Sequence, residues 1–110
     1  MLTAVDIELL YFDDCPNWQI ARDRIAEALA ETGNAGTPIV LRAIDTPDEA
    51  EREAFPGSPT IRIDGVDACG PTTGVGLTCR VYHTPDGPAG APTVTDLVAA
   101  LCRAELRQRR

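Results

Sequence analysis

Apolar positions in the first half of the chain follow two different periods. Residues 4–12 begin with alternating apolar and polar positions and then become continuously apolar, which is typical of a central strand buried on both faces. Over residues 16–32 the apolar positions recur every three or four residues, and this predicts an amphipathic helix that ends at Gly33. A second apolar run at 38–44 predicts another short strand. The first half therefore reads strand, helix, strand.

Two further helices are predicted from their start signals. Thr46 is a favoured N-cap residue and Pro47 a favoured first helical residue, so a short helix should begin there and end before Pro56. Thr93 should cap the last helix, because Asp96 follows three residues later as in a short capping box. The apolar stripe predicted for this last helix consists of Val94, Leu97, Val98, Leu101 and Ala104.

Short strands and loops should fill the rest of the second half. Residues 57–65 alternate in polarity and close with an Asp-Gly turn, which predicts a third strand. Residues 66–77 are rich in glycine and threonine and are predicted to form a mobile loop. We expect 79–82 to be a fourth strand, paired as a hairpin with residues 60–63, and 84–92 to be a turn followed by loop.

This order of elements predicts an α/β fold in one domain that spans residues 1–110. A chain of 110 residues has no room for a second core. The first two strands, joined through a full helix, should be parallel with a right-handed crossover. Together with an antiparallel hairpin they form a mixed four-stranded sheet, and helices on both faces make a three-layer sandwich.

Composition excludes several classes of partner. The net charge is −7, whereas nucleic acids and anionic membranes require a basic face. No apolar run approaches the ~20 residues of a membrane helix. The start, Met1 to Asp6, lacks the basic region of a signal peptide, so we expect a cytoplasmic protein with reduced thiols. The four cysteines lack paired Cys-x-x-Cys spacing, so neither a structural zinc site nor a disulfide framework is expected. No cofactor is predicted.

Cys15 is the first candidate for chemistry. It follows an apolar strand and precedes Pro16, which suits the first position of a helix, so Cys15 is predicted to cap that helix. The unpaired amides and the dipole at a helix N-terminus favour thiolate over thiol. Asp13 and Asp14 act in the opposite direction if their carboxylates turn toward the sulfur. The alternative is that Cys15 is merely a small residue at a strand-to-helix junction.

The other cysteines and the histidine have different expected roles. Cys69 lies in the glycine-rich loop and is a candidate to resolve a mixed disulfide, or else an exposed spectator. Cys79 opens a short strand and is expected to pair with Cys69 or to be buried. Cys102 lies among the apolar positions of the last helix and is predicted to fill the core. His83 lies beside a turn and is expected to be a surface residue.

Pro59 is the second informative position. Proline is excluded from the interior of a central strand, so it must open the strand, lie at an edge or form a bulge. A proline fixed at such a place is a candidate for a cis Ser58–Pro59 bond. Trp18 is expected to pack against the sheet or to form a lip over the sulfur of Cys15.

Two segments of the chain carry a resemblance to a known fold. Cys15-Pro16-Asn17-Trp18 resembles the Cys-x-x-Cys motif of the thioredoxin-like superfamily, with tryptophan in place of the second cysteine. Ser58-Pro59-Thr60-Ile61 resembles its cis-proline segment, and this likeness implies a cis Ser58–Pro59 bond close to Cys15. The chain is most similar to a group of small thioredoxin- or glutaredoxin-like proteins, some of which carry the label alkylmercury lyase. No lyase motif is found in this sequence.

The resemblance implies a thiol–disulfide oxidoreductase. By that likeness Cys15 is the nucleophile, and the substrate, a small thiol or a protein, docks at Ser58, Pro59 and Thr60 beside Trp18. Because Trp18 replaces the second cysteine, the mixed disulfide would be resolved by glutathione, by Cys69 or by Cys79.

Two other functions remain open at this point. One is a thiolate site for a soft metal such as mercury or copper, built from Cys15 with Cys69 or Cys79, since two thiolates suffice for linear coordination. The other is an inactive scaffold that binds a peptide at the Ser58–Pro59 edge. The sequence does not fix the substrate, the redox partner or the oligomeric state.

Overall fold

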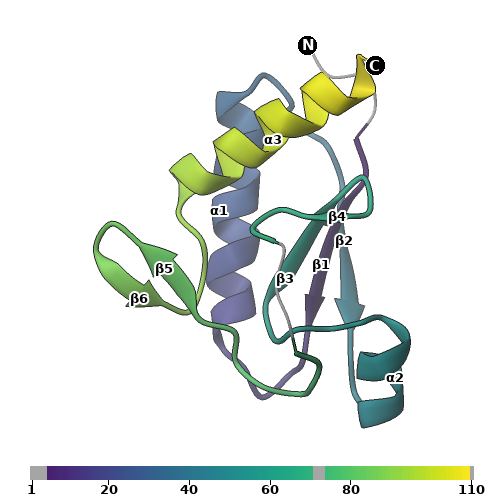
Figure 1. The fold of residues 1–110 in the computed structure, drawn as a ribbon. Coiled ribbons are helices and arrows are strands. Elements are labelled where there is room, and N and C mark those ends of the chain that lie inside the picture. Colours follow the sequence, from purple (N-terminus) through teal and green to yellow (C-terminus); the bar gives the residue numbers. More distant parts are fainter. Residues whose placement is uncertain (1–4, 71–73, 110) are drawn as a thin grey trace.

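The computed structural model describes residues 5–70 and 74–109 and contains three helices and six strands there (Figure 1). In chain order these are β1 (Ile7–Tyr11), α1 (Asn17–Glu31), β2 (Ile39–Ala43), α2 (Pro47–Arg52), β3 (Thr60–Ile63), β4 (Val66–Asp67), β5 (Tyr82–Thr84), β6 (Gly87–Ala89) and α3 (Val94–Gln108).

Four of the strands form one mixed sheet in the order β2-β1-β3-β4. Strand β1 pairs with β2 in parallel, Ile7 opposite Ile39, as the helical crossover between them requires. It pairs with β3 antiparallel, Leu9 opposite Ile61. The predicted α/β class and the mixed four-stranded sheet are therefore confirmed.

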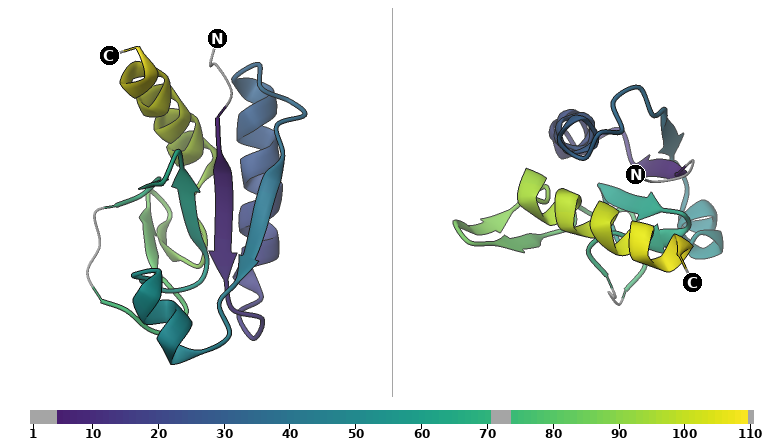
Figure 2. Two further views of the ribbon diagram at one scale, coloured as in Figure 1. Left: turned by 90° about the vertical axis from the view of Figure 1, so that its right-hand side faces the viewer. Right: turned by 90° about the horizontal axis from the view of Figure 1, so that it is seen from above.

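The two faces of the sheet are covered by different helices because successive side chains of a strand point to opposite faces. Leu9 and Ile61 belong to the core that α1 and α3 share with the sheet. Leu10 lies instead in a smaller core with Ala50 of α2 and Phe55. The views in Figure 2 show α1 and α3 running beside the sheet, with the short α2 set apart at one end.

Local start signals placed two helices correctly. The Thr46 side chain accepts a hydrogen bond from the Glu49 amide, with Pro47 as the first residue of α2. Thr93 and Asp96 form the reciprocal capping box at the start of α3. Both predictions are confirmed, and each helix thereby satisfies amides that would otherwise lack partners.

Helix α1 begins one residue later than the sequence predicts. Its N-cap is Pro16, which already has helical angles of φ −73° and ψ −14°. Cys15 precedes the cap, and its amide donates to the Phe12 carbonyl oxygen at 3.1 Å in a turn. Cys15 is therefore not the cap residue, although it stands at the junction of β1 and α1 as expected.

The prediction that residues 79–82 pair as a hairpin with 60–63 is wrong. Asp64 and Gly65 both have positive φ, 52° and 81°, and this tight two-residue turn returns the chain at once. Val66 and Asp67 then form β4, which pairs with β3 and is an edge strand of the sheet. The glycine-rich segment therefore begins as a strand, and its residues 71–73 lie outside the described part of the chain.

A separate two-stranded ribbon, β5 and β6, extends into the segment for which a loop was predicted. Strands β5 and β6 pair with each other, His83 opposite Pro88, and not with the main sheet. Figure 1 shows this ribbon projecting beside the N-terminal end of α1. Gly90 follows the ribbon and packs closely against Asn17 of α1, because a Cβ at residue 90 would lie 2.2 Å from the Asn17 side chain. The predicted turn is present, but residues 87–89 are strand.

An ionic cluster ties the end of α2 to the sheet. Glu53 follows α2, and its carboxylate accepts hydrogen bonds from Arg42 of β2 at 2.7 Å and from Arg62 of β3 at 3.2 Å. Arg62 also donates to the Glu53 carbonyl oxygen. This cluster fixes the chain just before the segment that leads to Ser58 and Pro59.

Candidate functional site

Cys15 is fully buried at the junction of β1 and α1. Its thiol donates a hydrogen bond to the Ser58 carbonyl oxygen at 3.4 Å. The sulfur is therefore hydrogen-bonded to a carbonyl oxygen in the segment just before β3 and not to an amide of α1. Asp13 and Asp14 are both exposed.

The Ser58–Pro59 peptide bond is cis, as predicted, and lies against Cys15. The Ser58 hydroxyl accepts a hydrogen bond from the Phe12 amide at 3.2 Å, which ties this segment to the end of β1. Ser58 and Thr60 are fully buried, and the Thr60 hydroxyl donates to the Gly57 carbonyl oxygen at 2.7 Å. The two sequence motifs are thus brought together.

Both backbone polar groups of Ser58 are already paired within the chain. The Ser58 amide donates to the Thr78 carbonyl oxygen at 2.7 Å, and the Arg80 amide donates to the Ser58 carbonyl oxygen at 2.9 Å. This is a parallel β-bridge between Ser58 and Cys79. Gly57 permits the approach, because a Cβ there would lie 3.1 Å from the Thr78 carbonyl oxygen.

The bridge brings a second thiol to Cys15. The pKa of Cys79 is raised, first by the interaction with the neighbouring Cys15 side chain and then by partial burial. Cys79 therefore holds its proton more tightly than an ordinary exposed cysteine does. Unlike Cys15, Cys79 is exposed to solvent. Cys15 and Cys79 form the thiol pair of this site.

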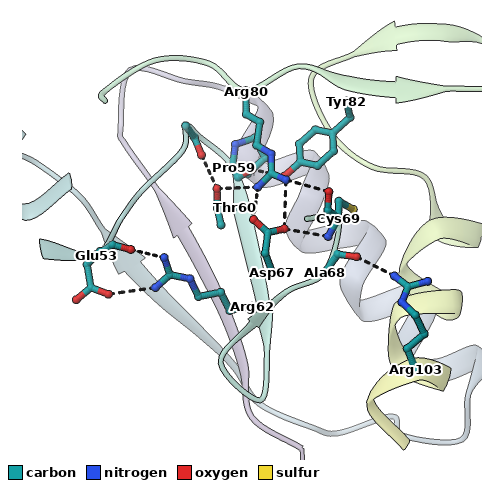
Figure 3. A network of polar contacts seen from close by, with 11 residues as sticks. Glu53, Pro59, Thr60, Arg62, Asp67, Ala68, Cys69, Arg80, Tyr82 and Arg103 are labelled. Atoms are coloured by element: carbon teal, nitrogen blue, oxygen red, sulfur yellow. Dashed lines mark hydrogen bonds and ion pairs between the residues drawn. The ribbon is translucent and has the colours of Figure 1, made fainter. Parts of the chain in front are cut away.

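A buried arginine holds the segment that carries Cys79. The Arg80 guanidinium, 7% exposed, binds the Asp67 carboxylate at 2.7 and 3.2 Å and the Thr60 hydroxyl at 3.2 Å (Figure 3). It also lies over the ring of Tyr82, 4.7 Å from the centroid. The Tyr82 hydroxyl donates to the Pro59 carbonyl oxygen at 2.5 Å. Hydrogen bonds therefore hold residues 78–82 against each residue of the Ser58–Thr60 segment.

Cys69 lies in a different environment from the thiol pair. Its amide donates to the Asp67 carboxylate at 2.9 Å and its carbonyl oxygen accepts from Arg80 at 3.3 Å (Figure 3). Burial raises the pKa of the Cys69 thiol to about 11, against the opposing charge of Arg80. The residue borders a pocket of about 420 Å³ that is also lined by Tyr82, His83 and Arg103. The resolving role of Cys69 stays a prediction.

Cys102 and His83 are the remaining candidates, and only the prediction for His83 is confirmed. Cys102 is exposed, so the prediction that it fills the core is wrong. The buried stripe of α3 runs through Leu97, Leu101 and Ala104, and Cys102 is one residue, about 100°, off that stripe. His83 is exposed, as expected for a surface histidine.

Trp18 packs against β1 in the first turn of α1. Its ring stacks on Tyr11 with centroids 4.4 Å apart and an interplanar angle of 25°. The Arg22 guanidinium lies over the indole ring, 5.4 Å from the centroid. The expected packing against the sheet is confirmed, because Tyr11 is the last residue of β1.

Within 5–70 and 74–109, no three or more His, Cys, Asp or Glu side chains gather as they would around a metal ion. None of the helices in those ranges has the length and apolar character needed to cross a membrane. Comparison of the chain with models of known protein families, with curated proteins and with solved structures found no match.

Proposed function

We propose that this chain is a thiol–disulfide oxidoreductase of thioredoxin-like architecture that works through Cys15, with Cys79 as its second thiol. The observation that carries the proposal is that both thiols lie at Ser58: the Cys15 thiol donates to the Ser58 carbonyl oxygen, and Cys79 is bridged to Ser58 by backbone hydrogen bonds. Two neighbouring thiols can exchange two electrons with an external disulfide by forming one bond between them.

The surroundings of the pair support exchange over a purely structural role. Cys15 lies at a strand-to-helix junction beside Ser58–Pro59, the arrangement on which the resemblance to thioredoxin-like proteins rests. In a reducing compartment such as the cytoplasm the pair would be held as two thiols at rest. An oxidised substrate would then draw electrons from it.

The proposal is tested by equilibrating the protein in buffers of graded thiol-to-disulfide ratio. The fraction that contains a Cys15–Cys79 disulfide is measured by mass spectrometry after acid quenching. Trp18 is the only tryptophan and begins the turn that follows Cys15, so its fluorescence is a second readout. We expect one reversible two-electron transition that Cys15→Ser abolishes. A pair that stays reduced under every oxidising buffer would refute the function.

A soft-metal site is the second candidate, because the same observation favours it. Two adjacent thiolates can hold mercury(II) or copper(I) in linear coordination without a third ligand. In that case Cys15→Ser and Cys79→Ser should each weaken metal binding by the same large factor, and neither should alter disulfide exchange. If Cys15→Ser loses disulfide exchange, and the wild type binds the metal no more tightly than an exposed thiol does, the oxidoreductase is favoured.

A further inference from the structure

The two thiols of the pair differ in their access to solvent. Cys15 is 0% exposed, whereas Cys79 is exposed. Exchange requires the attacking sulfur to reach a disulfide bond, so access decides which thiol can react first. The buried thiol of Cys15 donates to the Ser58 carbonyl oxygen, and Cys79 is bridged to the same residue, so an external disulfide reaches Cys79 before it reaches Cys15.

The edge beside the proline is closed to an extended peptide. A peptide can add to a strand only where backbone amides and carbonyls are free to pair. At Ser58 both groups are bonded, to Thr78 and to Arg80. Arg80 is anchored in turn by Asp67 and Thr60, so residues 78–80 cannot leave without breaking a buried ion pair. The chain's own segment occupies the position of a peptide substrate.

We propose that Cys79 is the entry thiol for small-molecule disulfides and that Cys15 resolves the mixed disulfide, a division of roles that rests on the exchange function proposed above. This reverses the order that the sequence predicts, in which Cys15 attacks first. The substrate class follows from the closed edge: a small disulfide needs only the exposed Cys79 sulfur and no pairing with Ser58.

The reaction proceeds in two balanced exchanges. Cys79, as its thiolate, attacks one sulfur of a disulfide RSSR, forming the Cys79–SR bond and releasing RS⁻, which takes up the proton that Cys79 gave up. Cys15 then attacks the Cys79 sulfur, forming the Cys15–Cys79 disulfide and releasing the second RSH. The two thiols are oxidised and RSSR is reduced to two RSH. Two molecules of a small thiol reverse the sequence and restore the pair.

The environment of Cys79 makes entry dependent on pH and on Cys15. The interaction with Cys15 is the largest cause of the raised pKa of Cys79, so the thiolate fraction near neutral pH is small. The entry rate should therefore increase as the pH rises. Cys15→Ala removes that interaction, so Cys79 should react faster in this variant than in the wild type.

The experiment uses bis(2-hydroxyethyl) disulfide as probe, because it is small and uncharged and the net charge of −7 does not influence its approach. Wild type, Cys15→Ala and Cys79→Ser are exposed to the probe for graded times and quenched with acid. Adducts are then located by fragmenting the peptides in a mass spectrometer. Cys102 is exposed and present in all three proteins, so it is the internal reference for an ordinary accessible thiol.

The expected pattern is specific to each variant. Cys15→Ala should accumulate the adduct at Cys79, with no internal disulfide. Cys79→Ser should acquire the adduct at Cys102, while Cys15 reacts at least about tenfold more slowly than Cys102. In denaturant the two should react at similar rates, because burial no longer protects Cys15. Should Cys15→Ala fail to fold, Cys15→Ser replaces it as the trapping variant.

Two outcomes overturn different parts of the argument. If Cys15 in folded Cys79→Ser reacts as fast as Cys102, while wild type still forms the internal disulfide, the entry order is wrong and the exchange function stands. If wild type never forms the Cys15–Cys79 disulfide although Cys79 acquires the adduct, the exchange function fails, and resolution by Cys15 fails with it.

Discussion

Replacing Arg80 with methionine should destabilise the protein and loosen the segment that carries Cys79. The change removes a guanidinium that is 7% exposed and that binds Asp67 through two contacts, of 2.7 and 3.2 Å. Breaking a fully buried ion pair by removing one partner costs about 3–5 kcal/mol. The Asp67 side chain keeps 22% of its exposure to water, which reduces the loss, so we expect about 2–4 kcal/mol.

The assay is urea unfolding followed by far-ultraviolet circular dichroism and Trp18 fluorescence, since a domain of this size has only about 5–15 kcal/mol of stability in total. Arg109→Met is the matched control. Arg109 pairs with Glu105 at 2.8 Å but is 68% exposed, so its loss should be at most about 0.5 kcal/mol. A loss for Arg80→Met that is no larger than the control's would show that the buried pair does not hold this segment.

The same variant separates the anchoring role of Arg80 from its contribution to stability. If Arg80 holds residues 78–82 against Ser58, its removal should lower the yield of the Cys15–Cys79 disulfide in a given redox buffer, even where the protein remains folded. Arg80→Lys keeps the charge but not the forked geometry, so it should give an intermediate yield. An unchanged yield in folded Arg80→Met would contradict the anchoring role.

Three further predictions concern the surroundings of the site. Gly57→Ala should destabilise by roughly 2 kcal/mol and more than Gly33→Ala, because both glycines have a positive φ, +132° and +78°, but only at Gly57 would a Cβ meet neighbouring atoms within 4 Å; equal losses in urea unfolding would contradict this. Arg42 lowers the pKa of Glu53 from its ordinary 4.5, so stability present above that pH should be lost as the pH falls through the lowered value. Glu53→Gln should flatten this acid limb, and an unchanged slope of stability against pH would refute the assignment. Cys69, with its pKa raised to about 11, should react with iodoacetamide more slowly than an exposed cysteine at neutral pH, as measured by peptide mass spectrometry; labelling at an equal rate would show an open thiol.

Features determined by nearby residues could be predicted from the sequence. The caps at Thr46 and Thr93 use partners within three residues, so the signal and the structure lie in the same short window. The cis bond at Pro59 was predicted from the likeness of Ser58-Pro59-Thr60-Ile61 to a known cis-proline segment. The parallel pairing of β1 and β2 follows from an apolar pattern whose period changes from strand to helix and back.

Features that depend on distant partners could not be predicted in the same way. Strand β4 has two residues, too few to show a period, although Asp64-Gly65 is a typical signal of a hairpin turn and would have located it. The approach of Cys79 to Cys15 depends on backbone hydrogen bonds of Ser58, which leave no mark on side-chain composition. Cys102 was misplaced because one residue on a helix turns the side chain by about 100° away from the core.

The first turn of α1 contains no thiol that could pair with Cys15, so the second thiol of the proposed pair comes from elsewhere in the chain. Trp18 lies in that turn and stacks on Tyr11. Cys79 reaches Cys15 only because residues 78–80 are bridged to Ser58. A thiol pair within one turn of helix persists whenever that helix forms, whereas this pair exists only while a separate segment is docked. We therefore expect the redox chemistry proposed for Cys15 to depend on the docking of residues 78–82, and the contacts of Arg80 with Asp67 and Thr60 to stabilise that docking.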